Sequence, residues 1–506
     1  MMLDLSIIAT AVPWITKEFE SLLDVGWYGS SYQLASASLQ PLTGKMYTYF
    51  RTKWTFFTFF FIFELGSLLC GIAQSSKMLI VARAVAGLGA AGLMNGGLTI
   101  VAACLPNHKR PSAMGLMIAI GQLGQACGPL IGGAFTEKVS WRWCFYINLP
   151  IGGLIIALIG FIYIPERTTK PPFRSILTTL VTTLDLPGFV IFAPAAIMFF
   201  LALQYGGNKY AWDSATVISL FVGSGLTFIL FMCWEYRKGE EAMIPFSMLR
   251  QRIVWASCAT MFFLIGVLSC AAYYLPIYFQ AVLGASPIRS GVLYLPNILL
   301  HITMSMTSGI LVQRLGYYLP WVVSGSAISA TAYGLLSMLT PTYPAAKRIG
   351  YQILAGFGCG CAATMPFIAT QSLISTPRIP VAMGILIFCQ NFGGATFLTL
   401  AETDFSQSLK VALKKYAPGS DASAIISLGA TGFRDVVNKE ELPGILEAYS
   451  EACDNIFLLV CGLSAGAFLC AWGMGWGDVR KGKKGMVEGR EQGTAENRAN
   501  GETTTV

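Results

Sequence analysis

The sequence predicts an all-α polytopic membrane protein, built as two six-helix lobes with two extra central helices, and three observations support this fold class. Of its 506 residues, 54% are hydrophobic and only 12% are charged, about half of the roughly 25% that is usual in a soluble domain. The apolar residues fall in blocks near twenty residues long, the length that crosses about 30 Å of hydrocarbon as a helix. Several short segments also recur at a nearly constant spacing, which indicates two related halves.

Apolar runs between charged residues and Pro or Gly breaks define thirteen complete spans. They lie near residues 27–47, 55–74, 79–102, 112–135, 143–164, 187–205, 215–234, 254–280, 289–312, 319–339, 347–371, 382–402 and 455–476. A fourteenth apolar stretch, from Met1 to about Ile15, is too short to cross the hydrocarbon core. It lacks the basic start and small-residue cleavage site of a signal peptide, so we interpret it as the outer half of a truncated first span.

Lys and Arg are concentrated in one set of alternate connections, and the positive-inside tendency places that set in the cytoplasm. The C-terminus is therefore predicted to be cytoplasmic. The predicted divisions are an N-terminal lobe at 1–164, two linker spans with cytoplasmic loops at 165–252, the first five spans of a C-terminal lobe at 253–402, an outer loop at 403–453, the last span at 454–477 and a cytoplasmic polar tail at 478–506. The outer loop is amphipathic with mixed charge, and residues 485–506 are polar enough to be disordered.

Three short segments of the first half return in the second half. The pairs are 113–118 with 382–387, 86–89 with 355–358 and 43–44 with 308–309, at offsets of 269, 269 and 265. Each pair occupies the same place in its half, which predicts parallel repeats about an axis along the membrane normal. The spans at 187–205 and 215–234 have no counterpart, so the predicted architecture is six plus two plus six.

Composition also excludes several classes of function. The net charge of +8 comes from Lys and Arg scattered through short loops, so no nucleic-acid partner is expected. His108 and His301 have no Cys or carboxylate ligands beside them, and most of the thirteen Cys lie inside apolar segments, so no metal site and no cofactor are expected. A membrane enzyme would need such clusters at the bilayer edge, and we expect no enzymatic activity.

Glycines recur every four residues in the span at 112–135. The motif consists of Gly121, Gly124, Gly128, Pro129, Gly132 and Gly133. Small residues at this spacing form a flat face that lets another backbone approach closely, and a proline bends the helix. Close packing alone would explain the glycines; the functional alternative is a hinge on which the lobes rock.

Charged residues at membrane depth are the candidates for proton coupling. Asp4 lies on the partial first span, Glu64 inside the span at 55–74, and Arg83 opens a glycine-rich segment. A charge in the bilayer costs several kcal/mol, about 3 on insertion scales, so each is expected to face a partner or water. Arg83 could instead snorkel to the interface, and Glu64 could simply bond to neighbouring helices.

Two further groups of residues are candidates for the path and the gate. Uncharged polar groups at membrane depth, which could line a substrate path or join helices, are Gln33, Gln122, Gln125, Gln390 and Asn391. A basic cytoplasmic turn that follows a glycine helix end contains Gly44, Lys45, Arg51 and Lys53. This turn could act as a gate, although positive-inside bias alone would explain its charge.

These motifs resemble the major facilitator superfamily, specifically the fourteen-span drug:proton antiporters of fungi that expel toxins and secondary metabolites. The resemblance covers residues 3 to 480. Its motifs are Leu3–Pro13 in the first span, Arg83–Gly92 in the fourth, the antiporter motif Gly121–Gly133 in the fifth, Trp141–Trp143 with Phe145–Pro150, and the outer loop near Gly429–Gly432. The antiporter motif is the most specific of these.

The chain departs from the family pattern in two places. The superfamily has an Asp and an Arg in the cytoplasmic turn where this chain has Thr48 and Tyr49, which puts the gating ion pair of that turn in doubt. Family members also carry a cytoplasmic tail and a whole first span before the position of Asp4, so a truncated, non-functional copy is one alternative.

The resemblance implies proton-coupled export of a small hydrophobic or amphipathic organic compound by a monomer in the lipid bilayer. In this scheme Asp4 or Glu64 exchanges the proton, Arg83 tunes that carboxylate, and the helix with Gly128 and Pro129 is the hinge. An importer of the same fold, for instance of iron chelates, is the nearest alternative because a fold does not fix direction or substrate. The plasma membrane is the expected location and the vacuolar membrane the alternative.

Overall fold

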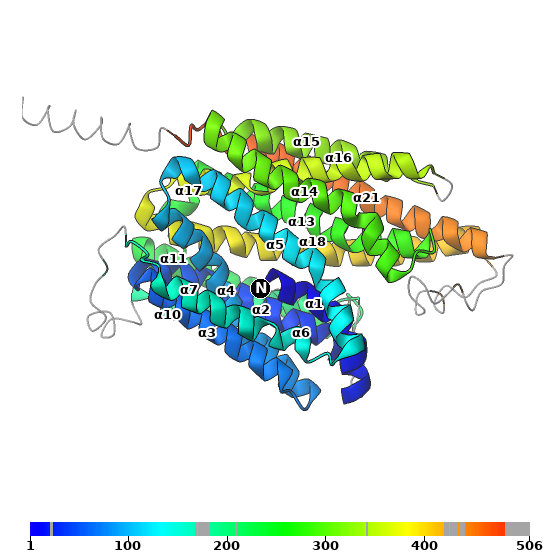
Figure 1. Ribbon diagram of the computed structural model, residues 1–506, viewed down its shortest axis with the longest axis horizontal. Coiled ribbons are helices and arrows are strands. Elements are labelled where there is room, and N and C mark those ends of the chain that lie inside the picture. Colours follow the sequence, from blue (N-terminus) through cyan, green and yellow to red (C-terminus); the bar gives the residue numbers. More distant parts are fainter. Residues whose placement is uncertain are drawn as a thin grey trace, which may run out of the picture.

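The computed structural model describes residues 1–20, 24–166, 170, 183–207, 210–340, 343–418, 425, 434 and 441–480. Within these residues the protein is a bundle of helices without a named β-strand (Figure 1). Twelve of the helical stretches are long and apolar enough to cross a membrane. The predicted all-α membrane fold is therefore confirmed.

The helices fall into two lobes and a linker pair. The N-terminal lobe contains α1 (Met2–Phe19), α2 (Val25–Tyr49), α3 (Thr52–Gly71), α4 (Ser76–Cys104), α5 (Arg110–Lys138), α6 (Trp143–Tyr146) and α7 (Asn148–Phe161). The linker pair is α10 (Leu186–Tyr205) and α11 (Ala215–Lys238). The C-terminal lobe contains α13 (Arg252–Ala281), α14 (Pro287–Leu315), α15 (Leu319–Leu336), α16 (Ala345–Ala363), α17 (Met365–Leu373), α18 (Ile379–Tyr416) and α21 (Leu442–Trp472).

Short elements connect these helices on the side that the sequence predicts to be cytoplasmic. They are η2 (Asn107–Lys109), η3 (Gly239–Glu241), α12 (Phe246–Leu249) and η4 (Thr376–Arg378). In Figure 1 most of the N-terminal lobe, blue to teal, lies below the green-to-orange C-terminal lobe, while α5 runs up to α14. The lobes meet mainly through two helix pairs, α2 with α18 and α5 with α14, with a smaller contact between α4 and α18. Helix α10 contacts both α2 and α18.

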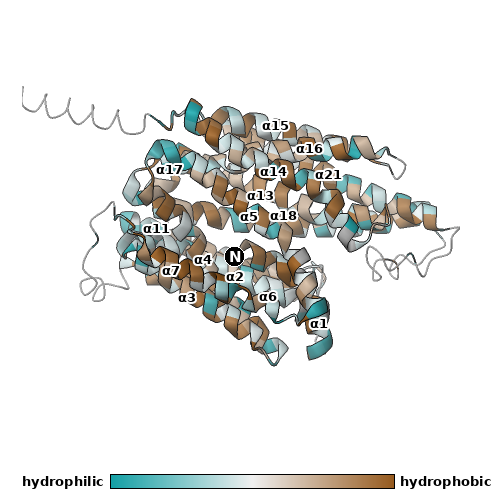
Figure 2. Ribbon diagram, in the orientation of Figure 1, coloured by the Kyte–Doolittle hydropathy of each residue, from teal (hydrophilic) through white to brown (hydrophobic). Residues whose placement is uncertain are grey.

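The outside of the bundle is apolar, as a lipid solvent requires. Large hydrophobic residues such as Phe61, Val81 and Leu226 are 64%, 64% and 65% exposed, respectively. Figure 2 shows brown, hydrophobic residues along the helices and teal, polar ones mainly towards their ends. A water-soluble protein rarely exposes apolar surface on this scale, so these faces suit hydrocarbon.

Three helix boundaries differ from the sequence prediction. Helix α1 continues to Phe19 rather than ending near Ile15, and α18 continues to Tyr416, past the predicted boundary at 402. The extension of α18 forms because Leu409, Ala412 and Leu413 recur at helical spacing and pack in one core with Ile445 and Ala448 of α21. Helix α21 accordingly begins at Leu442, before the predicted 454. The motif near Gly429–Gly432 and the tail at 485–506 lie outside the described residues.

The repeat seen in the sequence has a counterpart in helix packing. A Cβ atom on Gly87 of α4 would overlap the carbonyl oxygen of Tyr32 on α2, and one on Gly356 of α16 would overlap that of Asn297 on α14. The two glycines are separated by the repeat offset of 269 residues. Because each lets its helix approach the corresponding neighbour in its own lobe, the two halves are packed in the same way.

Candidate functional site

Asp4 and Arg83 form a buried ion pair inside the N-terminal lobe. Arg83 Nη1 lies 2.7 Å from Asp4 Oδ2, and both side chains are only 1% exposed. The Nε atom of Arg83 also donates a hydrogen bond to the Tyr28 carbonyl at 2.9 Å, and the guanidinium stacks over the Tyr32 ring at 4.5 Å. Arg83 therefore does not snorkel to the interface; it faces the carboxylate of α1.

Asn148, at the start of α7, binds the other oxygen of the same carboxylate. Its Nδ2 atom donates to Asp4 Oδ1 and to the Ser67 hydroxyl, each at 3.2 Å. Four helices, α1, α3, α4 and α7, thus converge on one polar cluster. Sequence reasoning noted Asn148 only as part of a motif, although a lone amide at the start of an apolar span was a usable signal.

Glu64 lies on α3, in the same lobe, and its carboxylate contacts Gly152 of α7, where a Cβ atom would overlap it. The Oε2 atom of Glu64 is buried and has no hydrogen-bond partner among the described residues. Gly152 lies one turn after Asn148, whose amide binds Asp4, so Glu64 packs on α7 beside the Asp4 cluster. The three proton-coupling candidates of the sequence are therefore brought into one region of the N-terminal lobe.

The glycine motif of α5 forms the surface on which α1 packs. Cβ atoms on Gly128 and Gly132 would overlap the hydroxyls of Ser6 and Thr10 on α1. Gly121 and Gly124 leave ordinary contact distances, 3.4 Å to Met2 Cγ and 3.6 Å to Leu3 N, and Gly133 has nothing within 4 Å. The close approach that the motif predicts is thus confined to two glycines. Pro129 lies within α5, which is continuous at this point.

Alanine at Gly128 or Gly132 is therefore expected to destabilise the protein, by about 1–3 kcal/mol through overpacking. Gly133→Ala is the matched control because its Cβ enters open space on the same helix. Thermal unfolding in detergent would compare the three variants. A melting temperature for Gly128→Ala equal to that of Gly133→Ala would contradict the packing described for α1 and α5.

The five uncharged polar candidates do not form one cluster. Gln33 on α2 and Gln125 on α5 are exposed, while Gln122, Gln390 and Asn391 are half-buried. No hydrogen bond joins any two of them in the part of the chain that the structure describes. The Oε1 atom of Gln390 on α18 is buried and has no hydrogen-bond partner in the described residues. It is the member of the five that has a buried acceptor without a donor there.

The two lobes touch, at the end that the sequence predicts to be cytoplasmic, through two equivalent glycine contacts. A Cβ on Gly44 of α2 would lie 2.9 Å from the carbonyl oxygen of Pro380 on α18, and one on Gly309 of α14 would lie 2.5 Å from that of Pro111 on α5. Pro111 and Pro380 are separated by the repeat offset of 269 residues. The closed end is thus made of two related backbone crossings, and in Figure 1 the lobes diverge towards the opposite end.

Hydrogen bonds between the lobes reinforce these crossings. Arg110 Nη1 donates to the Gln371 carbonyl at 3.1 Å, Gln371 Nε2 donates to the Leu98 carbonyl at 2.9 Å, and Asn95 Nδ2 donates to the Pro380 carbonyl at 3.2 Å. Arg110, Gln371 and Asn95 were not predicted as gate residues. Their roles depend on which helix faces of the two lobes meet. The spacing of residues along the sequence does not indicate which faces these are.

The basic turn predicted as a gate lies beside these contacts. Lys45 is buried and donates to the Glu241 carbonyl at 2.8 Å, whereas Arg51 is exposed. Lys53 donates to the carbonyls of Gly160 and Ile162, at the end of α7, at 2.8 and 2.9 Å. The turn is therefore hydrogen-bonded to η3, which follows the linker helices, and to the end of α7.

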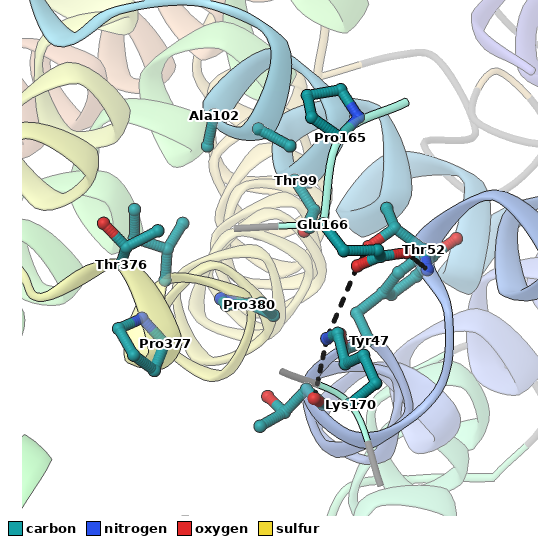
Figure 3. A pocket seen from close by; sticks show the side chains of 13 residues that line it. Tyr47, Thr52, Thr99, Ala102, Pro165, Glu166, Lys170, Thr376, Pro377 and Pro380 are labelled. Carbon is teal, nitrogen blue, oxygen red and sulfur yellow. Dashed lines mark hydrogen bonds and ion pairs between the residues drawn. The ribbon is translucent and has the colours of Figure 1, made fainter. Parts of the chain in front are cut away.

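A small cavity lies where this turn meets the C-terminal lobe (Figure 3). It is lined by Tyr47, Thr48, Thr52, Thr99, Ala102, Ala103, Pro165, Glu166, Lys170, Thr376, Pro377, Ile379 and Pro380. Its volume of about 40 Å³ admits water but no organic substrate. The cavity thus lies at the interface between the two closed lobes. If the lobes separated, the residues of η4 and α18 that line it would move away from the residues of the N-terminal lobe.

The chain is similar to known fungal membrane transporters over nearly its whole length. It is 53% identical to the MFS-type transporter pigP of Monascus ruber over 97% of this chain and 86% of that one. It is 50% identical to the efflux pump mlcE of Penicillium citrinum, over 94% of this chain and 88% of the relative, and 46% identical to the efflux pump mokI of Monascus pilosus, over 95% and 91%.

Solved structures share the fold at low sequence identity. The proton:xylose symporter XylE matches with a TM-score of 0.58 at 14% identity, covering 94% of this chain and 93% of that one. The human organic anion transporter MFSD10 matches with a TM-score of 0.57 at 15% identity, covering 93% and 96%. The family description Major Facilitator Superfamily matches residues 1–398. With its two repeated lobes and apolar exterior, the chain is a multi-pass membrane protein that belongs to the major facilitator superfamily.

Proposed function

We propose that this protein exports small hydrophobic or amphipathic organic compounds, such as drugs, toxins or secondary metabolites, in exchange for protons. Efflux is supported by the names of its relatives, two of which are efflux pumps. Proton exchange is supported by one observation above all, the buried pair of Asp4 and Arg83 with the amide of Asn148 beside it. An ionisable cluster at this depth is costly and marks proton or ion pathways in membrane proteins.

The chemistry of the cluster suits a proton carrier. While Asp4 is ionised, one oxygen accepts from Arg83 and the other from Asn148. When Asp4 takes up a proton, its carboxyl group loses its charge and its electrostatic attraction to Arg83. The Arg83 guanidinium then lacks a charged hydrogen-bond acceptor. Glu64, with a buried oxygen that has no partner in the described structure, is the second carboxylate that can hold the proton.

Alternating access would couple this event to the substrate. The lobes are closed at the end that we assign to the cytoplasm, so substrate uptake from that side would require the crossings at Gly44 and Gly309 to separate. In our scheme α5 is the hinge because it packs on α1 through Gly128 and Gly132 at one end and on α14 at the other. Loss of the Asp4–Arg83 pair would then shift α1 against α5. We place the protein in the plasma membrane as a monomer.

A transport assay with a defined probe tests this function. Purified protein would be reconstituted into vesicles with an acidic lumen, rhodamine 6G added outside, and the membrane potential clamped with potassium and valinomycin. A proton antiporter is expected to accumulate the dye until an ionophore collapses the pH gradient. An importer that moves substrate together with protons would not accumulate it, and an inactive protein would show no gradient-dependent uptake.

The two carboxylates are separated by conservative substitutions. Asp4→Asn is expected to abolish accumulation driven by the pH gradient, because its amide cannot release a proton, whereas counterflow of unlabelled against labelled dye should persist. Glu64→Gln distinguishes the second site. A Glu64→Gln protein that exports at the normal rate and with the normal pH dependence would remove Glu64 from the proton route.

A further inference from the structure

Glu166 binds the beginning of α3 from a segment that follows α7 (Figure 3). Its Oε1 atom accepts a hydrogen bond from the backbone N–H of Thr52 at 2.6 Å, and its Oε2 atom accepts one from the Thr52 hydroxyl at 3.0 Å. Thr52 is the first residue of α3, and the preceding Arg51 provides no side-chain cap. A carboxylate at this position satisfies a backbone donor and interacts favourably with the positive end of the helix.

Lys170 binds the neighbouring helix end with the opposite charge. Its Nζ atom donates to the carbonyl oxygens of Tyr47 and Thr48, each at 2.7 Å, in the last turn of α2. Helix α2 has no basic residue of its own in that turn. Burial lowers the pKa of Lys170, and the Glu166 carboxylate, 3.9 Å away, acts in the opposite direction and favours the charged ammonium.

Lys53 adds a third contact of the same kind. It lies in the first turn of α3 and donates to the carbonyls of Gly160 and Ile162 where α7 ends. We call Lys53, Glu166 and Lys170 the cytoplasmic bracket. Together they bind the ends of α7, α3 and α2 with the charge sign that each helix end favours.

The bracket lies at the seam between the lobes. Glu166 and Lys170 line the small cavity on the side of the N-terminal lobe, and η4 with the start of α18 lines the other side (Figure 3). Gly44, one turn before the α2 carbonyls that Lys170 binds, contacts Pro380 of α18. The position of the α2–α3 turn therefore decides whether α18 can close against it.

We propose that Glu166 and Lys170 are positioning residues of the cytoplasmic gate. By capping the adjacent ends of α3 and α2, they hold the turn where α18 closes on it. This inference rests on the proposed alternating access but not on proton coupling. It also accounts for the departure at Thr48 and Tyr49, because the bracket brings a carboxylate and a cation to the same turn from another part of the chain.

The test reports gate closure directly. Thr99 is 7% exposed and lines the cavity, so Thr99→Cys places a thiol at the seam. Inside-out vesicles would be treated with a membrane-impermeant maleimide, and modification of residue 99 would be measured by mass spectrometry, because Cys104 is also exposed. Glu166→Gln or Lys170→Met is expected to raise the labelling rate about fivefold, the population change that loss of one helix cap of about 1 kcal/mol produces.

Charge exchange separates helix capping from simple ion pairing. If the pair acted only as a salt bridge, Glu166→Lys combined with Lys170→Glu would restore slow labelling. Capping predicts the opposite, because each exchanged charge faces the helix end that repels it. The exchanged variant should label at least as fast as either single variant, whereas Glu166→Asp and Lys170→Arg should remain close to the parent protein.

Matched controls come from an exposed ion pair at the other side of the membrane. Glu451→Gln and Lys415→Met, which break a 3.0 Å surface pair, should leave labelling unchanged. Unchanged labelling in Glu166→Gln and Lys170→Met, with normal size-exclusion profiles, would overturn the proposal, and so would restoration by charge exchange. Labelling requires no transport, so an inactive parent with fast-labelling variants would refute the proposed function and leave the bracket standing.

Discussion

Replacing Arg83 with leucine is expected to lower folding stability by about 3–5 kcal/mol, the cost of leaving one partner of a buried ion pair uncompensated. The Asp4 carboxylate, 1% exposed, would then keep the amide of Asn148 as its hydrogen-bond donor in the described structure. Accumulation of rhodamine 6G driven by the pH gradient should also be lost. Thermal unfolding in detergent and the vesicle assay would measure the two effects separately.

A double variant distinguishes stability from transport in this cluster. Asp4→Leu combined with Arg83→Leu should recover most of the stability, because a buried pair can often be replaced by apolar residues without loss, yet transport should stay absent. The exposed pair of Lys415 and Glu451 is the control, since Lys415→Leu should cost at most about 1 kcal/mol. If Arg83→Leu unfolded at the temperature of the parent protein, the ion pair would have no structural role.

The second large effect is expected at the glycine crossings between the lobes. In Gly309→Val the new side chain would begin 2.5 Å from the Pro111 carbonyl oxygen, so the cytoplasmic ends of α5 and α14 could not close. Overpacking of about 1–3 kcal/mol corresponds to a shift of roughly 5- to 150-fold towards the cytoplasm-open state. Labelling of Thr99→Cys from the cytoplasmic side should rise by a similar factor, and dye export should fall.

The repeat provides a second crossing at which the same prediction can be tested. Gly44→Val, at the related crossing with α18, should produce an effect of the same sign and similar size. Gly153→Val is the control, because nothing lies within 4 Å of a Cβ at that position on α7. Normal labelling and normal export in Gly309→Val would show that the lobes do not close through this contact.

The sequence predicted the helices and the lobes well because both leave periodic signals. Apolar blocks of span length and the 269-residue offset depend only on local composition and order. The glycine spacing of α5 likewise predicted a closely packed face. It could not identify α1 as the partner or single out Gly128 and Gly132, because that depends on how two helices are rotated about their axes.

The candidate site was predicted in part, for the same reason. Asp4, Glu64 and Arg83 were found because charges are rare inside apolar spans. Asn148 was not given a role, and Glu166 was missed because a carboxylate in a cytoplasmic loop looks like ordinary surface charge until the helix ends it binds are known. The end of α18 was placed too early because charged residues between 402 and 416 hid an apolar stripe that packs on α21.

The crossings between the lobes are made by backbone atoms, and this affects how they depend on ionic strength. Gly44 and Gly309 bring the lobes together through close contact with carbonyl oxygens, and the hydrogen bonds beside them also end on carbonyls. Dissolved ions screen exposed charges over about 10 Å at 0.1 M, but they act far less on buried dipoles in contact. The two backbone crossings are therefore expected to respond little to cytoplasmic ionic strength. Any salt dependence of gate closure would then come from the charged bracket of Glu166 and Lys170, whose interactions with helix ends are screened by dissolved ions.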